Sequence, residues 1–313
     1  MAGVGLDPVA EAKMTAMRWA DSTEGVQVAL HDLGGKGAQV LLAHATGFAG
    51  RIWEPVTAHL QGYRCFALDA RTHGSTRTPP QAARSWTAVA EDVLAAVAAL
   101  GLRGCAAAGH SMGAAALLLA EVTEPGTFSS LYCYEPVTQP LNTQVALQDG
   151  VLAALTLHRR YVFESLDAAR QNFSAKDPFQ SFTGPSLEAY LQHCFRPLEP
   201  NDQPGPDSQP PAGAAAITLA CPRQDESELY RLGRYHGLFE RLGEITCPVV
   251  IASGARQPGT PSHFAPAVAA ALDLSRFLQY PDLGHFGPQQ DPARIAADIG
   301  EAWRSPPTRK QPT

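Results

Sequence analysis

The chain has 313 residues, of which 45% are hydrophobic and 17% charged, and its formal net charge is −6. This length suits one large α/β domain with an insertion or two ordinary domains, and the apolar fraction is sufficient for a substantial core. The negative charge and the shortness of every basic run argue against a nucleic-acid-binding surface.

The N-terminal segment lacks the basic start and apolar core of a signal peptide, and no apolar stretch is long enough to cross a bilayer. The C-terminal residues match no peroxisomal or ER-retention signal. We therefore expect a cytoplasmic protein without a membrane span. The 6 cysteines lie far apart, without a C-x-x-C pair or a Cys/His pair at ligand spacing, and this pattern predicts neither a disulfide framework nor a metal site.

Apolar, β-rich runs alternate with helix-period segments along most of the chain, which is typical of a mostly parallel sheet covered by helices. The predicted helices are residues 86–100, 114–122, 151–158, 187–194 and 266–272, and a last helix opens at Asp291-Pro292 with Asp291 as its N-cap. The predicted strands are residues 27–30, 39–44, 64–69, 104–109, 130–134, 249–253 and 276–280.

The alternation is interrupted over residues 137–241. This stretch holds two of the predicted helices and then a Pro-rich segment, residues 196–211, which we expect to be a surface loop because proline supports neither ladder nor helix hydrogen bonds. An insertion of this length between strands of one sheet is most simply a separate cap. The predicted organisation is a core of residues 1–136 and 242–313 with a mainly helical cap of residues 137–241.

The stretch Gly109-His110-Ser111-Met112-Gly113 fits the pattern G-x-S-x-G. It lies between a predicted strand and a predicted helix, which is the setting that a nucleophile elbow requires. The glycines suit a sharp turn in which bulkier neighbours would collide with the strand or the helix. The pattern predicts Ser111 as a nucleophile, and the alternative is a Gly-rich turn with an exposed serine.

A serine hydroxyl needs a base, and His285 follows the last predicted strand and precedes the last helix. The alternative for any single histidine is a surface or core position. A tetrahedral intermediate also needs donors for its oxyanion. We expect one donor to be the N–H of Met112 and the other to come from residues 44–50, unless that segment is a plain β–α turn.

The segments 44–50, 69–75, the elbow at Ser111, 247–250 and 284–286 occur in the order seen in the α/β-hydrolase superfamily, which the chain resembles over residues 18–136 and 242–303. The resemblance implies an α/β-hydrolase fold, with a mostly parallel sheet covered by helices on both faces and an inserted helical cap. A looser resemblance links the cap to small cap-bearing hydrolases through segments 177–179, 219–222 and 228–230.

Two departures from the superfamily pattern affect the site. The usual His-Gly of the oxyanion loop is here His44-Ala45, so the loop donor could be Phe48 or Thr46. The usual acid is also missing, because the G-x-x-D position after strand 249–253 reads Gly254-Ala255-Arg256-Gln257. Some branches place the acid after the strand that follows the nucleophile helix.

Glu135 occupies that earlier position, at the end of the predicted strand 130–134. There a carboxylate could hold the far nitrogen of the catalytic histidine. The alternatives for the acid are Asp282, Asp225 and Glu226. Glu135 could instead cap the first turn of the insertion.

Other residues near the site have predicted roles as well. Asp69, Arg71 and His73 match the D-x-R-x-H-G segment of the superfamily, which implies a structural role. The predicted substrate-binding residues flank the nucleophile, the base or the oxyanion loop, although the side chain of His110 could instead pack and orient the elbow. They are His44, Gly47, His110 and Phe286.

The predicted function is a serine hydrolase that cleaves an ester, thioester or lactone of a modest-sized apolar small molecule through a Ser111–His285–Glu135 triad and an acyl-enzyme. No metal or organic cofactor is implied. A C–C bond hydrolase or an acyltransferase could use the same triad, and a non-catalytic ligand-binding protein could share the fold. Epoxide hydrolases and haloalkane dehalogenases are disfavoured because they use aspartate at the elbow. The oligomeric state is left open.

Overall fold

The computed structural model describes residues 17–308 except 142, 144–146, 200–201, 203–214 and 234. Within these residues, an 8-stranded sheet has the order β1-β2-β4-β3-β5-β6-β10-β11. Its first two strand pairs, β1–β2 and β2–β4, are antiparallel, and all later neighbours are parallel. The strands are β1 (Arg18–Asp21), β2 (Gln27–Gly35), β3 (Ala38–Ala43), β4 (Tyr63–Leu68), β5 (Cys105–His110), β6 (Phe128–Tyr134), β10 (Val249–Ser253) and β11 (Ser275–Gln279).

All seven predicted strands are confirmed, with β2 extending beyond its predicted end and β10 matching its predicted bounds. Strand β3 shows why its sequence is apolar throughout. Val40 and Leu42 belong to one buried cluster, and Leu41 and Ala43 belong to the other, so the strand is covered on both faces. The short edge strand β1 was not predicted, because only one of its four residues is buried.

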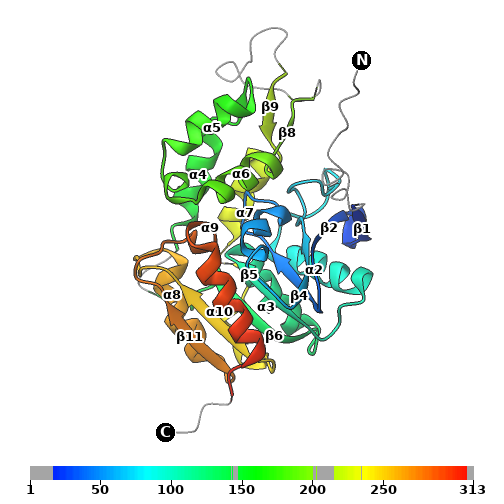
Figure 1. Ribbon diagram of the computed structural model, residues 1–313, viewed down its shortest axis with the longest axis vertical. Coiled ribbons are helices and arrows are strands. Elements are labelled where there is room, and N and C mark those ends of the chain that lie inside the picture. The colour runs from blue at the N-terminus through cyan, green and yellow to red at the C-terminus, as the bar shows by residue number, and fades with distance from the viewer. Residues whose placement is uncertain are drawn as a thin grey trace, which may run out of the picture.

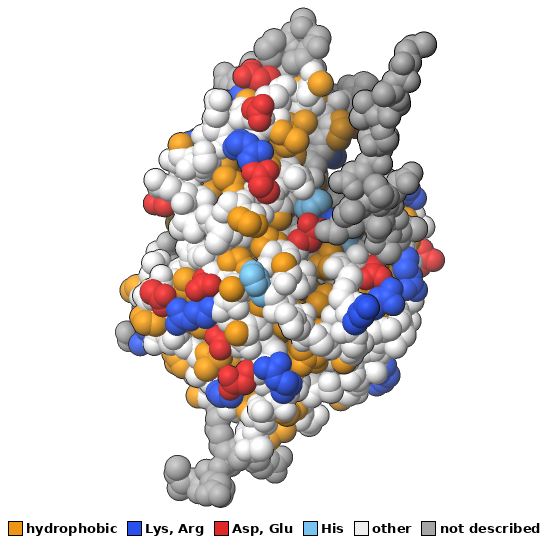
Figure 2. Space-filling view, in the orientation of Figure 1, with side chains coloured by type: hydrophobic (Ala, Val, Ile, Leu, Met, Phe, Trp, Pro, Cys, Tyr) orange, Lys and Arg blue, Asp and Glu red, His pale blue; other side chains and the backbone are white. Residues whose placement is uncertain are grey.

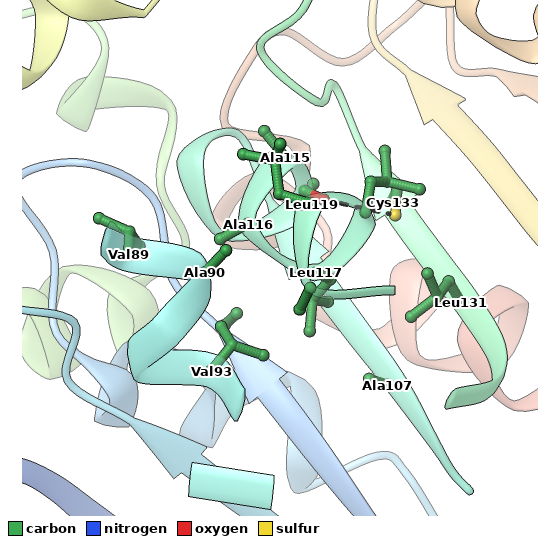
Figure 3. Close-up of a cluster of buried hydrophobic side chains, with 14 of the residues drawn as sticks. Val89, Ala90, Val93, Ala107, Ala115, Ala116, Leu117, Leu119, Leu131 and Cys133 are labelled. Carbon is green, nitrogen blue, oxygen red and sulfur yellow. Dashed lines mark hydrogen bonds between the residues drawn. The ribbon is translucent and has the colours of Figure 1, made fainter. Parts of the chain in front are cut away.

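Helices cover both faces of the sheet (Figure 1). On one face lie α2 (Trp86–Leu100), α3 (Met112–Thr123) and α8 (Pro261–Ala271), and on the other lie α1 (Glu54–Thr57) and α10 (Pro292–Arg304). Figure 3 shows the first layer, in which Val89 and Val93 of α2 lie beside the alanine and leucine side chains of α3. The α/β-hydrolase fold predicted from the sequence is confirmed.

The helix ends follow local chemistry. Helix α2 has its predicted bounds, since Ser85 caps its first turn and Gly101 ends it with a φ of 67°. The predicted N-cap of α10 is also confirmed, because the Asp291 carboxylate accepts the Arg294 N–H at 3.1 Å. Helix α8 begins earlier than predicted, at Pro261, which suits the first helical position.

Residues 137–241, called the inserted segment below, join β6 to β10. They contain α4 (Asp149–His158), α5 (Leu166–Ser174), α6 (Gly184–His193) and α7 (Arg223–Leu232). Helices α4 and α6 were predicted, whereas α5, α7 and a three-stranded antiparallel sheet were not. In Figure 1 these elements form a lobe at one end of the core. The strands of the small sheet, in spatial order, are β7 (Val162–Phe163), β9 (Ile217–Leu219) and β8 (Phe195–Pro197).

The predicted Pro-rich loop needs a correction at its start. Arg196 and Pro197 belong to β8, which tolerates a proline because it is an edge strand. Most of the remaining loop prediction, residues 200–201 and 203–211, lies outside the described residues. Among the described residues, no helix combines the length and apolar character needed to cross a bilayer. Basic and acidic side chains are interspersed over the face drawn in Figure 2.

Candidate active site

Ser111 sits at a sharp turn between β5 and α3. Its φ of 55° and ψ of −113° form a strained conformation for a residue with a side chain. Both flanking glycines are required by close backbone packing. A Cβ on Gly109 would lie 2.6 Å from the Ala114 nitrogen, and one on Gly113 would lie 2.3 Å from the Ala43 oxygen. This is the strand–turn–helix geometry of a nucleophile elbow.

The structure brings Ser111, His285 and Glu135 into one hydrogen-bonded series. His285 Nε2 lies 3.2 Å from Ser111 Oγ, and His285 Nδ1 lies 2.6 Å from Glu135 Oε2. Ser111 follows β5, Glu135 follows β6, and His285 lies in the turn between β11 and α9 (Gly287–Gln290). Because these strands are parallel, their carboxyl ends share one edge of the sheet, and that edge assembles the series.

The Glu135 carboxylate is 1% exposed and has a partner for each oxygen. Oε2 faces His285, and Oε1 accepts the Gly254 N–H at 2.9 Å. Gly254 stands directly after β10, where the more common arrangement begins its G-x-x-D segment. The backbone at that position therefore supports the carboxylate that β6 supplies.

The alternative acids are engaged elsewhere. Asp282 forms an exposed ion pair with Arg294 at 2.8 Å, and Asp225 pairs with Arg84 at 3.0 Å. Glu226 is buried and pairs with Arg159. Burial raises the pKa of the Glu226 carboxyl, although Arg159 opposes the shift. Of the predicted candidates, Glu135 alone contacts His285 in the described structure.

Two side chains hold the backbone around His285. The Tyr134 hydroxyl donates to the Gly284 carbonyl at 2.7 Å, and His110 Nε2 donates to the His285 carbonyl at 2.7 Å. Burial lowers the pKa of His110 well below its usual value, so its ring is neutral. His110 is 1% exposed and does not border the cavity described below, so the predicted substrate contact is replaced by a contact with the histidine loop.

The loop after β3 leaves the Thr46 N–H free to serve an oxyanion, whereas the N–H groups of Gly47 and Phe48 already have acceptors. The Phe48 N–H donates to the Ala45 carbonyl at 3.1 Å, and the Gly47 N–H donates to His73 Nε2 at 2.9 Å. Phe48 is therefore not available as the predicted donor. The Thr46 N–H has no acceptor among the described residues, and Thr46 borders the same cavity as Ser111. The Met112 N–H, at the first position of α3, is also free of a helical acceptor.

His73 and His44 shape this loop from behind. Burial lowers the pKa of His73 to about 3, so its neutral ring can accept from Gly47. His44 Nε2 accepts the Ala70 N–H at 3.0 Å, and its Nδ1 donates to the Ala45 carbonyl at 2.7 Å. Neither His44 nor Gly47 borders the cavity, so their predicted substrate contacts are replaced by structural ones.

Asp69 and Arg71 match their predicted structural role. The Asp69 carboxylate accepts the backbone N–H groups of Gly50 at 2.6 Å and Ser75 at 2.7 Å. Arg71 forms a fully buried ion pair with Asp92 at 2.8 Å. Both residues fix loops beside the site without reaching the cavity.

A cavity of about 240 Å³ opens at Ser111 and His285. Phe286 lines it at the predicted place, whereas Leu147, Leu152 and Tyr230 of the inserted segment were not among the predicted site residues, since spacing in the sequence gives no signal for them. No lysine, arginine, aspartate or glutamate of the described chain lines this cavity. The lining residues are Ala45, Thr46, Trp86, Ser111, Val137, Leu147, Gln148, Leu152, Tyr230, Gly233, Gly259, Thr260, Pro261, His285 and Phe286.

Residues 40–298 match the sequence model described as the alpha/beta hydrolase family. The chain belongs to the α/β-hydrolase family. It is 28% identical over 271 residues to a candidate non-heme bromoperoxidase, BpoC, of Mycobacterium tuberculosis, and the match covers 82% of this chain and 90% of the relative.

Solved structures share the fold of this α/β hydrolase. An E-2-(acetamidomethylene)succinate hydrolase aligns with a TM-score of 0.73 and 16% identity, over 93% of this chain and 99% of the other. The esterase RhEst1 from Rhodococcus sp. aligns with a TM-score of 0.69 and 19% identity, over 93% and 99%. A thermophilic esterase from Thermogutta terrifontis aligns with a TM-score of 0.66 and 20% identity, over 94% and 100%.

Proposed function

We propose that this α/β hydrolase is a serine hydrolase that cleaves a carboxylic ester, thioester or lactone through an acyl-enzyme. The observation that carries the proposal is the series from Ser111 Oγ to His285 (3.2 Å) and on to Glu135 (2.6 Å), which opens into an uncharged cavity. A weakly acidic hydroxyl beside an oriented imidazole is the arrangement that activates a serine nucleophile.

The reaction begins when His285 Nε2 takes the hydroxyl proton and Ser111 Oγ attacks the substrate carbonyl. The N–H groups of Met112 and Thr46 stabilise the oxyanion that forms. His285 then protonates the leaving group, and the acyl group stays on Ser111. In the second half, His285 removes a proton from water, which attacks the acyl-enzyme carbonyl. His285 then returns that proton to Ser111 Oγ as the bond to the acyl carbon breaks and the acid leaves. Glu135 keeps the Nδ1–H in place and stabilises the imidazolium in both halves.

The cavity supports an apolar substrate. Charged side chains are missing from its described lining, and most of its wall is aliphatic or aromatic. Its volume of about 240 Å³ exceeds the roughly 150 Å³ of an apolar cavity that binds benzene. We further propose that the inserted segment acts as a cap, since Leu147, Leu152 and Tyr230 supply one wall.

A substrate panel tests the proposal. Wild type and Ser111→Ala are assayed against p-nitrophenyl esters, acyl-CoA thioesters, lactones and C–C diketones. We expect the wild type to hydrolyse at least one of the ester, thioester or lactone classes, and Ser111→Ala to lose about 10⁴-fold or more of that activity. Turnover of C–C diketones alone would reassign the reaction. Inactivity on every class would favour a binding protein.

A further inference from the structure

Helix α4 exposes large aliphatic side chains to solvent. Val151 is 56% exposed, Leu152 is 45% exposed and Leu155 is 63% exposed. The opposite face of the helix packs on α7, where the Ser227 hydroxyl donates to the Ala153 carbonyl at 2.9 Å. The exposed residues are therefore not needed to hold α4 in place. We call Val151, Leu152 and Leu155 the α4 strip.

The α4 strip is continuous with the cavity. Residues 148, 152 and 155 fall on one side of the helix, at spacings of four and three. Gln148 and Leu152 border the cavity that opens at Ser111, and Leu155 stands one turn farther along the helix. Val151 precedes Leu155 by four residues and so lies beside it. An apolar path thus runs from the cavity wall at Leu152 onto the outer surface.

The start of α4 is fixed against the loop before α8. The Gln148 N–H donates to the Gly259 carbonyl at 3.0 Å, and this contact joins the start of α4 to the loop before α8. In Figure 1, α4 lies in the lobe, below α5 and beside α6. A chain that leaves the cavity past Leu152 meets Leu155 next.

We propose that the α4 strip binds the distal methylenes of a long acyl chain whose ester carbonyl sits at Ser111, so that the enzyme prefers long-chain acyl esters. This inference rests on the proposed hydrolase function. The cavity holds the carbonyl-proximal part of the chain, and the strip covers one side of the remainder. Full burial of one methylene raises affinity about fourfold. One-sided burial on the strip should therefore raise affinity about twofold for each added methylene.

Chain-length profiles with matched variants test this. The kcat/KM values for p-nitrophenyl esters of 4, 8, 12 and 14 carbons are measured, at concentrations below micelle formation, for wild type, Leu155→Gln and Leu166→Gln. Leu166 of α5 is a suitable control because it is 42% exposed and does not border the cavity. We expect Leu155→Gln to lower kcat/KM about fivefold or more for the 14-carbon ester and less than twofold for the 4-carbon ester, while Leu166→Gln changes neither.

The result that overturns the proposal is an unchanged chain-length profile in Leu155→Gln, or equal losses in both leucine variants. If light scattering shows a wild-type dimer that Leu155→Gln dissociates, the strip binds a second copy of the chain, which also overturns it.

A binding measurement separates this inference from the proposed function. Calorimetric binding of a tetradecyl methyl ketone to Ser111→Ala should weaken about fivefold in the Leu155→Gln background, whether or not the wild type hydrolyses any ester. If the wild type hydrolyses no ester but the ketone binds Ser111→Ala and binds less tightly when Leu155→Gln is added, the hydrolase function is refuted and the acyl-chain site is supported. Unweakened ketone binding would refute the site.

Discussion

The variant Glu135→Gln tests whether the Glu135 carboxylate orients His285 for catalysis or only supports the local structure. In the wild type, Oε1 accepts the Gly254 N–H at 2.9 Å and Oε2 faces His285 Nδ1 at 2.6 Å. A glutamine has a single acceptor oxygen. If that oxygen keeps Gly254, the amide NH₂ faces Nδ1, which must then be unprotonated. The proton moves to Nε2, which faces Ser111 Oγ at 3.2 Å and can no longer accept the serine proton.

The expected loss follows from this tautomer change. We predict that Glu135→Gln lowers kcat by about 10² to 10⁴, which corresponds to roughly 2.7–5.4 kcal/mol of transition-state stabilisation. KM should change little, because Glu135 does not border the cavity. Steady-state hydrolysis of a p-nitrophenyl ester gives both constants, and circular dichroism checks that the variant is folded.

Asp282→Asn is the matched control. Asp282 is 61% exposed and pairs with Arg294 on the surface, so its neutralisation should change kcat less than about twofold. A Glu135→Gln enzyme within tenfold of the wild type would refute the tautomer argument. A larger loss in Asp282→Asn than in Glu135→Gln would move the acid to Asp282.

Three further predictions concern stability, each measured by urea unfolding. Gly109→Ala should lower the free energy of unfolding by more than about 3 kcal/mol, because the added Cβ would lie 2.6 Å from backbone. Gly243→Ala is the control: its Cβ would have nothing within 4 Å, so the free energy of unfolding should change by less than about 1 kcal/mol. Similar losses in both variants would contradict the packing argument. Glu226→Ala should lower the free energy of unfolding by about 2–3 kcal/mol, because it leaves the half-buried Arg159 without its ion-pair partner. Adding Arg159→Met should restore part of this stability. If the double variant is no more stable than Glu226→Ala, the unpaired charge is not the cause of the loss. The depressed pKa values of buried His73 and His110 mean that the unfolded chain binds protons more readily than the folded chain. Their contribution to stability is therefore complete only well above pH 6.5 and falls as the pH drops, by roughly 1 kcal/mol for each histidine between pH 7.5 and 5.5. A His110→Gln variant with the same slope would exclude His110 as a source.

The core was predictable because local sequence and tertiary environment agree there. The doubly covered strand β3 is apolar throughout, and Ser85 and Gly101 mark both ends of α2. The elbow at Ser111 could be predicted from the sequence because close backbone packing requires glycine at positions 109 and 113. The place of His285 after the last strand pointed to the base, and the resemblance to branches that place the acid after the strand following the nucleophile helix pointed to Glu135.

The unpredicted features depend on contacts between distant segments. Strands β7, β8 and β9 have two or three residues each, too few for a periodic pattern, and exist because they pair with one another. The choice between Phe48 and Thr46 depended on which N–H groups the fold already uses. The cavity wall joins residues from α2, α4, α7 and the loop before α8, which no single stretch of sequence brings together.

Covalent labelling tests the central claim most directly. A fluorophosphonate reacts with an activated serine, and peptide mass mapping locates the adduct. We predict one adduct per chain, on Ser111, and none in Ser111→Ala. An adduct that persists in Ser111→Ala, or a folded wild type that is not labelled at all, would contradict the assignment of Ser111 as an activated nucleophile.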